Sequence, residues 1–165
     1  MKCLCFSDSH GRSSGIRRAL LTHPDTEVVF FLGDGLSDIL PLVSENRNIA
    51  WIFVRGNCDI FREIDSREAK TVDDITLMGK KIVLTHGDRY GAKYGYGELV
   101  ALAKRTDADI VLFGHTHQPY ESYYSEAEVY LFNPGSIGGA YPAPTSYGII
   151  MLTETGVLFS HAFLT

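Results

Sequence analysis

The 165-residue sequence contains no apolar run of membrane-spanning length and no excess of basic residues. Its apolar opening, residues 1–6, ends at once in a polar segment, so we expect neither a signal peptide nor a transmembrane helix. Lys and Arg number 15 against 20 Asp and Glu, which gives a formal net charge of -5. Such a surface repels a long polyanion. We therefore expect a cytoplasmic protein that binds neither membranes nor nucleic acids.

Cysteine is also scarce. The three cysteines, Cys3, Cys5 and Cys58, are odd in number and lack the paired spacing of a disulfide framework. Cys3 and Cys5 alternate on an expected buried strand and are interpreted as small core residues. With 45% hydrophobic residues the chain can bury one substantial core, whereas two domains would each be small. A single domain over residues 1–165 is expected.

The first third of the chain alternates apolar runs with amphipathic segments. The predicted strands span 2–6, 28–32 and 49–54. Ser13 or Ser14 is expected to cap the first intervening helix, whose inward residues would be Ile16, Ala19 and Leu20. Ser37 is expected to cap the second, with Ile39, Leu40 and Val43 inward. This β-α-β-α-β series implies a parallel sheet with right-handed crossovers.

The rest of the chain contains mostly short strands. They are predicted at 71–72, 75–78, 82–84, 110–113, 123–124, 129–132, 147–152 and 157–163. Leu99, Leu102 and Ala103 mark one helix, and 61–70 is irregular. Residues 89–97 hold three glycines and three tyrosines and are interpreted as a mobile surface loop that could form a lip over a site. A second, mainly antiparallel sheet is expected.

Polar residues with metal-binding side chains follow the predicted strands. Asp8, Asp34 and Asn57 come directly after the first three, and the carboxyl ends of parallel strands meet at one edge of a sheet. Each residue alone has a simpler explanation as a helix cap or turn residue. Together they place three oxygen ligands on one rim.

Four of the six histidines follow short apolar runs and neighbour glycine, namely His10, His86, His115 and His117. Imidazole nitrogen suits first-row metals, and a bend at Gly114 would let His115 and His117 point at different ions. A His-x-His pair alone is more often a surface or hydrogen-bonded pair. With the oxygen groups, however, the set holds seven ligands, which suits two ions that share a carboxylate.

The order of these motifs resembles that of the calcineurin-like metallophosphoesterases, specifically the small phosphodiesterase group called YfcE-like or archaeal-type. The matching segments are Asp8-Ser9-His10-Gly11, Gly33-Asp34, Gly56-Asn57, His86-Gly87, Gly114-His115-Thr116-His117 and Asn133-Pro134-Gly135-Ser136. On physical grounds alone, the last is only a turn. The resemblance covers nearly the whole chain and implies an α/β fold, a four-layer αββα sandwich of two mixed β-sheets flanked by helices.

The resemblance also implies an activity and a role for each candidate ligand. The chain would be a metal-dependent phosphodiesterase that hydrolyses small phosphodiesters through a dinuclear metal centre and a bridging hydroxide. Asp8, His10 and His117 would bind one metal, Asn57, His86 and His115 the other, and Asp34 would bridge them. Mn²⁺ is the expected ion, with Fe, Zn or Ni able to substitute, because this ligand mix separates them poorly.

One position departs from the wider family. Many members carry a histidine after the Asn of the third motif, thought to protonate the leaving oxygen, and here that place is Cys58. A thiol with a pKa of about 8.5 is a weaker match for that task. The small phosphodiesterase group commonly has Gly-Asn-Cys. The proton donor therefore stays open between Cys58, His10 and a metal-bound water, and we expect a preference for esters with good leaving groups.

Other functions stay open. The run from Asn133 to Tyr141 also resembles that of the retromer subunit, a non-catalytic protein-binding scaffold of this fold. A phosphomonoesterase or nucleotide pyrophosphohydrolase would need a positive clamp, for which Arg12, Arg55, Arg62, Arg89 and Lys93 are candidates. A nuclease is disfavoured because the basic residues are scattered. The tyrosine-rich segments make a homodimer plausible.

Overall fold

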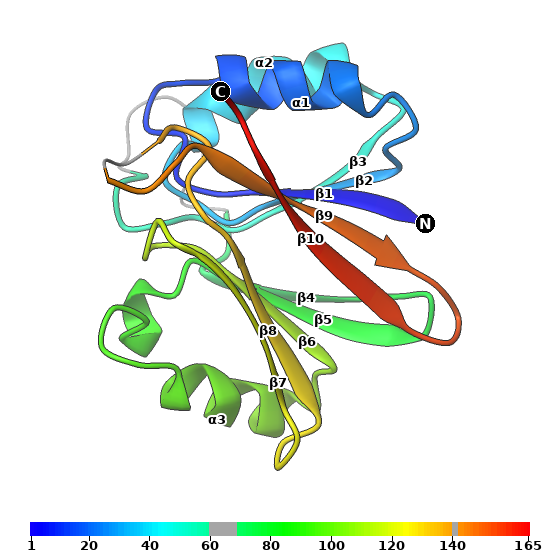
Figure 1. The fold of residues 1–165 in the computed structure, drawn as a ribbon, viewed down its shortest axis with the longest axis vertical. Helices are drawn as coiled ribbons and strands as arrows, with labels where there is room; N and C mark the ends of the chain where they lie inside the picture. The colour runs from blue at the N-terminus through cyan, green and yellow to red at the C-terminus, as the bar shows by residue number, and fades with distance from the viewer. Residues whose placement is uncertain (60–68, 140–141) are drawn as a thin grey trace.

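Two face-to-face sheets form the centre of the protein (Figure 1). The structure, a computed structural model, describes residues 1–59, 69–139 and 142–165. Within these ranges, each sheet has five strands and is mixed. Helices α1 and α2 lie on the outer side of one sheet and α3 on the outer side of the other. The predicted four-layer sandwich is confirmed.

The first sheet has the strand order β10-β9-β1-β2-β3. Its strands are β1 (Lys2–Phe6), β2 (Val28–Phe31), β3 (Ala50–Phe53), β9 (Ser146–Leu152) and β10 (Val157–Phe163). β1, β2 and β3 are parallel, with α1 (Ser14–Thr22) and α2 (Leu36–Glu45) as their crossovers, as predicted. β9 pairs antiparallel with β1, and β10 with β9.

The second sheet has the order β4-β5-β6-β8-β7. Its strands are β4 (Val72–Leu77), β5 (Lys80–Thr85), β6 (Ile110–Phe113), β7 (Pro119–Tyr124) and β8 (Val129–Pro134). The prediction of a mainly antiparallel second sheet was wrong. The last two strands join the first sheet, and β5, β6 and β8 are parallel because α3 (Gly97–Thr106) and the β7 strand carry the chain back between them.

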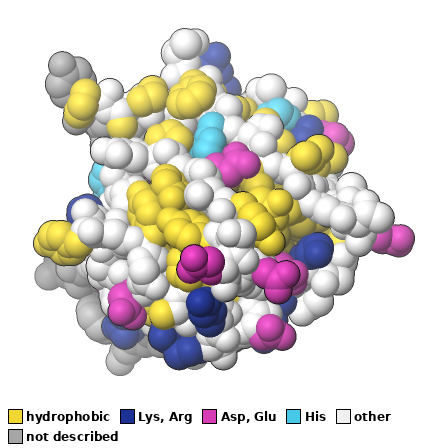
Figure 2. Space-filling model, turned by 60° about the horizontal axis from the view of Figure 1, so that its bottom comes forward, with side chains coloured by type: hydrophobic (Ala, Val, Ile, Leu, Met, Phe, Trp, Pro, Cys, Tyr) yellow, Lys and Arg dark blue, Asp and Glu magenta, His cyan; other side chains and the backbone are white. Residues whose placement is uncertain are grey.

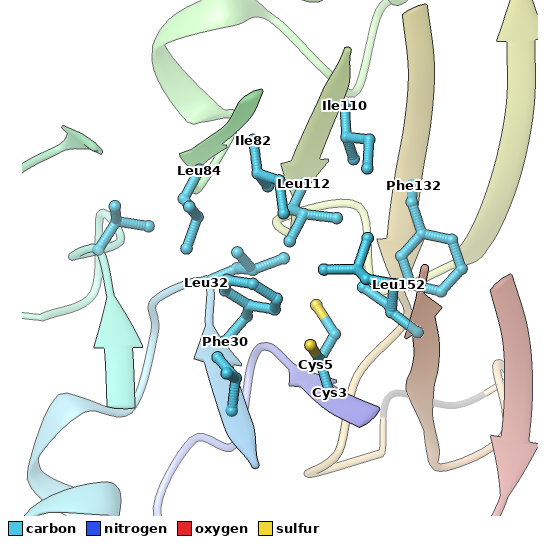
Figure 3. Packing of buried hydrophobic residues seen from close by; sticks show 13 residues of the cluster. Cys3, Cys5, Phe30, Leu32, Ile82, Leu84, Ile110, Leu112, Phe132 and Leu152 are labelled. Atoms are coloured by element: carbon cyan, nitrogen blue, oxygen red, sulfur yellow. The ribbon is translucent and has the colours of Figure 1, made fainter. Parts of the chain in front are cut away.

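The inner faces of the two sheets meet in a continuous apolar core (Figure 3). Cys3, Cys5 and Phe30 of the first sheet pack with Leu112 and Phe132 of the second, and all five are fully buried. The interpretation of Cys3 and Cys5 as core residues is confirmed. Because side chains alternate along a strand, the intervening residues of β1 pack outward against the helices. Burial on both faces explains the unbroken apolar run of β1.

The helices follow the predicted positions, with two corrections. α1 buries Ile16, Ala19 and Leu20 as predicted. α2 buries Ile39 as predicted, but Leu36 and Leu42 complete its buried stripe, and the predicted Leu40 and Val43 are only half-buried beside it. Neither helix has a side-chain cap from the predicted serines, since Ser13 makes no capping hydrogen bond and Ser37 lies inside α2.

The segment 89–97, predicted to be a surface loop, lies between two helices. It begins in the short 3-10 helix η1 (Asp88–Tyr90) and continues through turns over 91–96 to the start of α3, with Ala92 buried. The irregular segment predicted at 61–70 lies mostly outside the described residues. No helix in the described ranges is long and apolar enough to cross a membrane.

Candidate metal centre

The candidate ligands lie in loops at the carboxyl ends of strands from both sheets. Asp8, Asp34 and Asn57 follow β1, β2 and β3, while His86 follows β5 and His115 follows β6. Main-chain hydrogen bonds join these loops to one another: Asp8 N–H donates to Gly33 O (3.0 Å) and Gly114 N–H to His86 O (3.0 Å). Segments far apart in sequence therefore share one edge of the sandwich.

Asp8 is fully buried, and its two carboxylate oxygens differ. Oδ2 accepts hydrogen bonds from Ser7 Oγ (2.6 Å) and from the main-chain N–H of His115 (3.1 Å). Oδ1 has no hydrogen-bond partner, although His117 Nε2 lies 3.1 Å and His86 Nε2 3.9 Å away. The hydrogen bonds to Oδ2 fix the orientation of the carboxylate, and Oδ1 faces the two imidazoles.

His86 also has one hydrogen-bonded atom and one atom without a partner. Its ring is fully buried, and Nδ1–H donates to Leu32 O at 2.7 Å. Since a carbonyl only accepts, Nδ1 carries the proton, and this bond sets which nitrogen is free for a metal. The other nitrogen, Nε2, has no hydrogen-bond partner and lies 3.4 Å from Asp34 Oδ2. The His115 ring stands edge-on to it, with centroids 5.1 Å apart.

These atoms fit divalent cations. Asp8 Oδ1 and His86 Nε2 are two of the three buried side-chain atoms without a partner in the described ranges, and such atoms are costly unless something fills the space between them. His10 Nε2 and His117 Nε2 lie 3.3 Å apart, as two ligands about 2.0–2.1 Å from one tetrahedral ion would. Two groups of three ligand atoms lie within 4.8 Å of one another: Asp8 with His10 and His117, and Asp8 with Asp34 and His86.

The charges of the centre favour cations. Burial opposes the charge of Asp34, but the close contact and charge of His86 and the N–H of Cys58 hold its pKa well below the usual range. Burial likewise lowers the pKa of His86, yet its contact with Asp34 and the charge of Asp8 raise it overall. Burial, then the charges of His86 and Lys93, lower the pKa of His115. A site that raises the proton affinity of a buried imidazole also attracts metal ions.

Five candidate ligands have left-handed backbone conformations. Their φ angles are 55° at Asp8, 45° at His10, 59° at Asp34, 67° at His115 and 59° at His117. Only three other described non-glycine residues have positive φ, so the strain is concentrated in this centre. Each such residue costs on the order of 1–3 kcal/mol and persists only where surrounding contacts hold it.

The third predicted motif lies against Asp34. Gly56 allows this approach, because a Cβ there would be 2.1 Å from Asp34 Oδ1. Asn57 is exposed, and its amide donates to Cys58 Sγ (3.2 Å). Cys58 Sγ forms a further group with ligand atoms of His10 and Asp34 within 4.8 Å. Burial and the hydrogen bond and charge of Asp34 raise the pKa of Cys58 to about 11, so it stays a thiol at neutral pH.

Sequence reasoning missed two carboxylates that hold these loops. Asp59 accepts four main-chain N–H groups: Asp34 and Gly56 on Oδ2, Gly35 and Leu36 on Oδ1, at 2.7–2.9 Å. It thereby supplies the cap of α2 that was predicted for Ser37. Asp38 accepts Ser9 Oγ and the N–H of Gly11 (2.8 Å) on one oxygen. The only sequence signal is that Asp59 follows directly after Asn57 and Cys58.

The Asn133-Pro134-Gly135-Ser136 segment is more than a turn. Asn133 Nδ2 donates to Gly114 O (2.8 Å) and Thr116 Oγ1 (3.1 Å), which holds the loop of His115 and His117. Ser136 Oγ donates to Asp8 O (2.8 Å). The N–H of Gly138 donates to the same carbonyl, and a Cβ on Gly138 would be 2.4 Å from Ser9 O. One segment thus positions the two loops that carry most of the candidate ligands.

Comparison with known proteins gives a consistent result. The model of the calcineurin-like phosphoesterase superfamily domain matches residues 1–155. Phosphodiesterase YfcE of Escherichia coli strain K12 is 31% identical over an alignment of 173 residues, covering 91% of this chain and 87% of YfcE.

Among solved structures, an archaeal phosphodiesterase has a TM-score of 0.77 and 25% identity, covering 99% of this chain and all of its own. A single mutant of Vps29 from Entamoeba histolytica has a TM-score of 0.75 and covers 100% of both chains. Because its identity is only 22%, that likeness shows the fold alone.

Proposed function

Because the chain belongs to the calcineurin-like phosphoesterase superfamily, we propose that it hydrolyses small phosphodiesters at a centre of two divalent cations. Its enzyme class is that of a phosphoric ester hydrolase, which its relatives' names support. The observation that carries the dinuclear proposal is the pair of buried, unpartnered ligand atoms, Asp8 Oδ1 and His86 Nε2. Two cations would supply Lewis-acid polarisation of the phosphoryl oxygens and a hydroxide nucleophile at neutral pH.

The proposed ligand sets follow the sequence motifs, and the distances support the grouping of Asp8 with His10 and His117 and the place of His86 beside Asp34. One cation would be held by Asp8, His10 and His117, the other by Asn57, His86 and His115, with Asp34 between them. The carboxylate of Asp34 stays ionised because its pKa is low, and Cys58 N–H and Gly56 fix its place. We propose Mn²⁺ as the ion, with Fe, Zn or Ni as substitutes.

Two residues are proposed as candidates to donate a proton to the leaving oxygen. The Cys58 thiol holds a proton at neutral pH, but a group with a pKa of about 11 gives it up reluctantly. His10 lies at the opening of the centre, with 37% of its side chain exposed, so substrate can reach it. A thiol with so high a pKa is a weak proton donor to an alkoxide, which supports a preference for esters with acidic leaving groups.

The charge distribution supports a small substrate. The net charge is -5, and Figure 2 shows Lys and Arg side chains interspersed with Asp and Glu on that face of the molecule. Such a surface offers little attraction to a nucleic acid. The charge of Lys93 lowers the pKa of His115, and we propose this lysine as the contact for a phosphoryl oxygen. Arg12, a candidate for the positive clamp, donates a guanidinium hydrogen bond to Gly138 O (2.8 Å). Arg62 lies outside the described residues. A cytoplasmic location is part of this proposal.

A phosphoester panel with each divalent metal tests the proposal. We expect hydrolysis of bis(p-nitrophenyl) phosphate with Mn²⁺, slower hydrolysis of the monoester, and two equivalents of metal per chain by elemental analysis. Asp34→Asn should abolish most activity while the fold is retained. Asp74→Asn, which alters an exposed residue of β4, is the matched control. Unchanged activity of Asp34→Asn would reject the proposed centre.

The scaffold alternative is distinguished by the same samples. Vps29 shares the fold at low identity. The run from Asn133 to Tyr141, which resembles that of the retromer subunit, includes residues 140–141, and these lie outside the described residues. A scaffold does not require buried ligand atoms with free lone pairs. A purified chain that binds no transition metal and hydrolyses no ester would favour the scaffold.

A further inference from the structure

Strand β10 forms an edge of the first sheet and pairs only with β9 in the described ranges. In Figure 1 it is the red strand, and no labelled helix or strand lies in front of it. Its sequence, VLFSHAF, has no charged residue and no proline. Exposed edge strands are usually protected by such residues, by bulges or by a covering element. Leu158 is 72% and Phe163 55% exposed, so the edge is both apolar and accessible.

The ladder with β9 determines which main-chain groups of β10 point outward. Thr153 N–H donates to Gly156 O, and Leu164 N–H donates to Thr145 O, at the two ends of the same antiparallel ladder. Hydrogen-bonded and non-bonded pairs alternate in such a ladder, so the even-numbered residues bond to β9. The odd-numbered residues Val157, Phe159, His161 and Phe163 therefore direct N–H and C=O groups away from the sheet.

We propose that β10 pairs antiparallel with β10 of a second copy of this chain, about a twofold axis at Ser160. In this register Val157 lies opposite Phe163, and Phe159 lies opposite His161. The outward-pointing groups then form four hydrogen-bonded pairs, or about eight hydrogen bonds, and none is left over. On the outer face Leu158 lies opposite Ala162. The product is one continuous sheet made from the two first sheets.

Two features favour a second copy over another partner. The first is self-complementarity, because an uncharged strand meets its own copy without like charges in opposition. The second is the charge at its ends. At the carboxyl end Arg18 is exposed and donates to Thr165 O (2.8 Å), while the turn before β10 carries exposed Glu154. The twofold axis brings the carboxyl end of β10, with Arg18, beside Glu154 of the partner subunit. By symmetry the same contact forms at both ends of the paired strands.

The pairing does not need to alter the metal centre. β10 runs parallel to β1, so its carboxyl end lies toward the edge that carries Asp8, and a twofold axis places the two centres at opposite edges of the joined sheet. Each centre is complete within its own subunit. The dimer can therefore be tested separately from the hydrolase activity.

Mass measurements over a dilution series test the pairing. We expect about 37 kDa for the wild type, twice the 18.3 kDa of one chain. Ser160→Lys should raise the dimer dissociation constant at least tenfold, because two ammonium groups would meet on the axis, whereas an exposed lysine costs the single chain little. Ser160→Thr should remain dimeric. Thr76→Lys places the same charge on the exposed face of β4, another edge strand, and should also remain dimeric.

A charge exchange tests the register. Arg18→Glu and Glu154→Arg should each weaken the dimer, and the double variant should restore it. Ester hydrolysis by Ser160→Lys should match the wild type, so a loss of activity alone bears on the proposed function and not on the pairing. A wild-type mass of 18.3 kDa at every concentration, or a dimer that Ser160→Lys leaves unchanged, would overturn the proposal.

Discussion

Replacement of Asp59 by asparagine should weaken both the fold and the metal centre. Its carboxylate accepts four main-chain N–H groups, which belong to the loop of Asp34, the start of α2 and Gly56. Asparagine has the same shape but only one acceptor oxygen. Its amide nitrogen would face two N–H donors, so at least two of the four hydrogen bonds are lost.

The magnitude follows from the charge of the acceptor. A hydrogen bond to a charged group contributes about 1.5–3 kcal/mol, so the loss of two would cost about 3–6 kcal/mol. Asp59 is half-buried, and water can reach part of the site, which favours the lower end, about 3 kcal/mol. That is a large part of a typical unfolding free energy of about 5–15 kcal/mol. Because the same carboxylate holds Asp34 N–H, metal affinity should fall about 10–100-fold.

Urea unfolding of the metal-free chain measures the first effect, and calorimetric titration with Mn²⁺ measures the second. Asp74→Asn removes an exposed carboxylate of β4 and should change the unfolding free energy by less than about 0.5 kcal/mol. If Asp59→Asn were as stable as this control, the four hydrogen bonds would not be holding the loops, and the reasoning would fail.

Four further changes probe the same contacts. Asn133→Ala removes the donors to Gly114 O and Thr116 Oγ1, so Mn²⁺ affinity should fall at least tenfold by titration, and unchanged affinity would contradict a positioning role. Gly138→Ala should lower kcat/KM at least tenfold, because its Cβ would meet Ser9 O, whereas Gly156→Ala, with nothing within 4 Å, should be neutral. In the metal-free chain, exposed Cys58 should react with iodoacetamide at pH 8 about tenfold more slowly than an ordinary thiol, because a pKa of about 11 leaves about 100-fold less thiolate but a stronger nucleophile. Asp34→Asn should speed that reaction, and equal rates in folded and denatured protein would exclude the shift. The pKa of His86 is raised in the metal-free fold, so its contribution to stability is complete below its unfolded value of about 6.5 and is lost as the pH rises through the folded pKa. Urea midpoints in a chelator should show this loss, and His86→Gln should remove it.

The parallel half of the fold could be predicted because its signals are local. Each buried strand is an unbroken apolar run followed by a helix with one apolar stripe, and such a series has few arrangements. The assignment of β9 and β10 to a sheet could not be predicted in this way. Their alternating pattern suits any half-buried antiparallel strand, and only the pairing of Cys3 with Ile150 in the folded chain places β9 beside β1.

The candidate ligands could be located because strand ends are visible in the sequence, but the residues that support them could not. Asp8, Asp34 and His86 each follow an apolar run, whereas Asp59 contacts residues 23–25 positions earlier and has no periodic signal. The sequence around Asn133 predicts only a turn. The groups that its amide contacts lie 17–19 positions away, so they leave no local signal. The left-handed conformations are also invisible, since histidine and aspartate do not require positive φ as a glycine turn does.

These supports explain how a strained, partly unsatisfied site can exist before any metal binds. The five candidate ligands with left-handed backbones and the two unpartnered buried atoms all cost free energy, and within the described ranges the compensation comes from hydrogen bonds to main-chain groups around them. Those bonds do not depend on a cation. The loops are therefore set by Asp59, Asn133 and Ser136, and bound metal stabilises a chain that is already folded by mass action. Because little ordering is needed on binding, most of the metal's interaction energy is available as affinity.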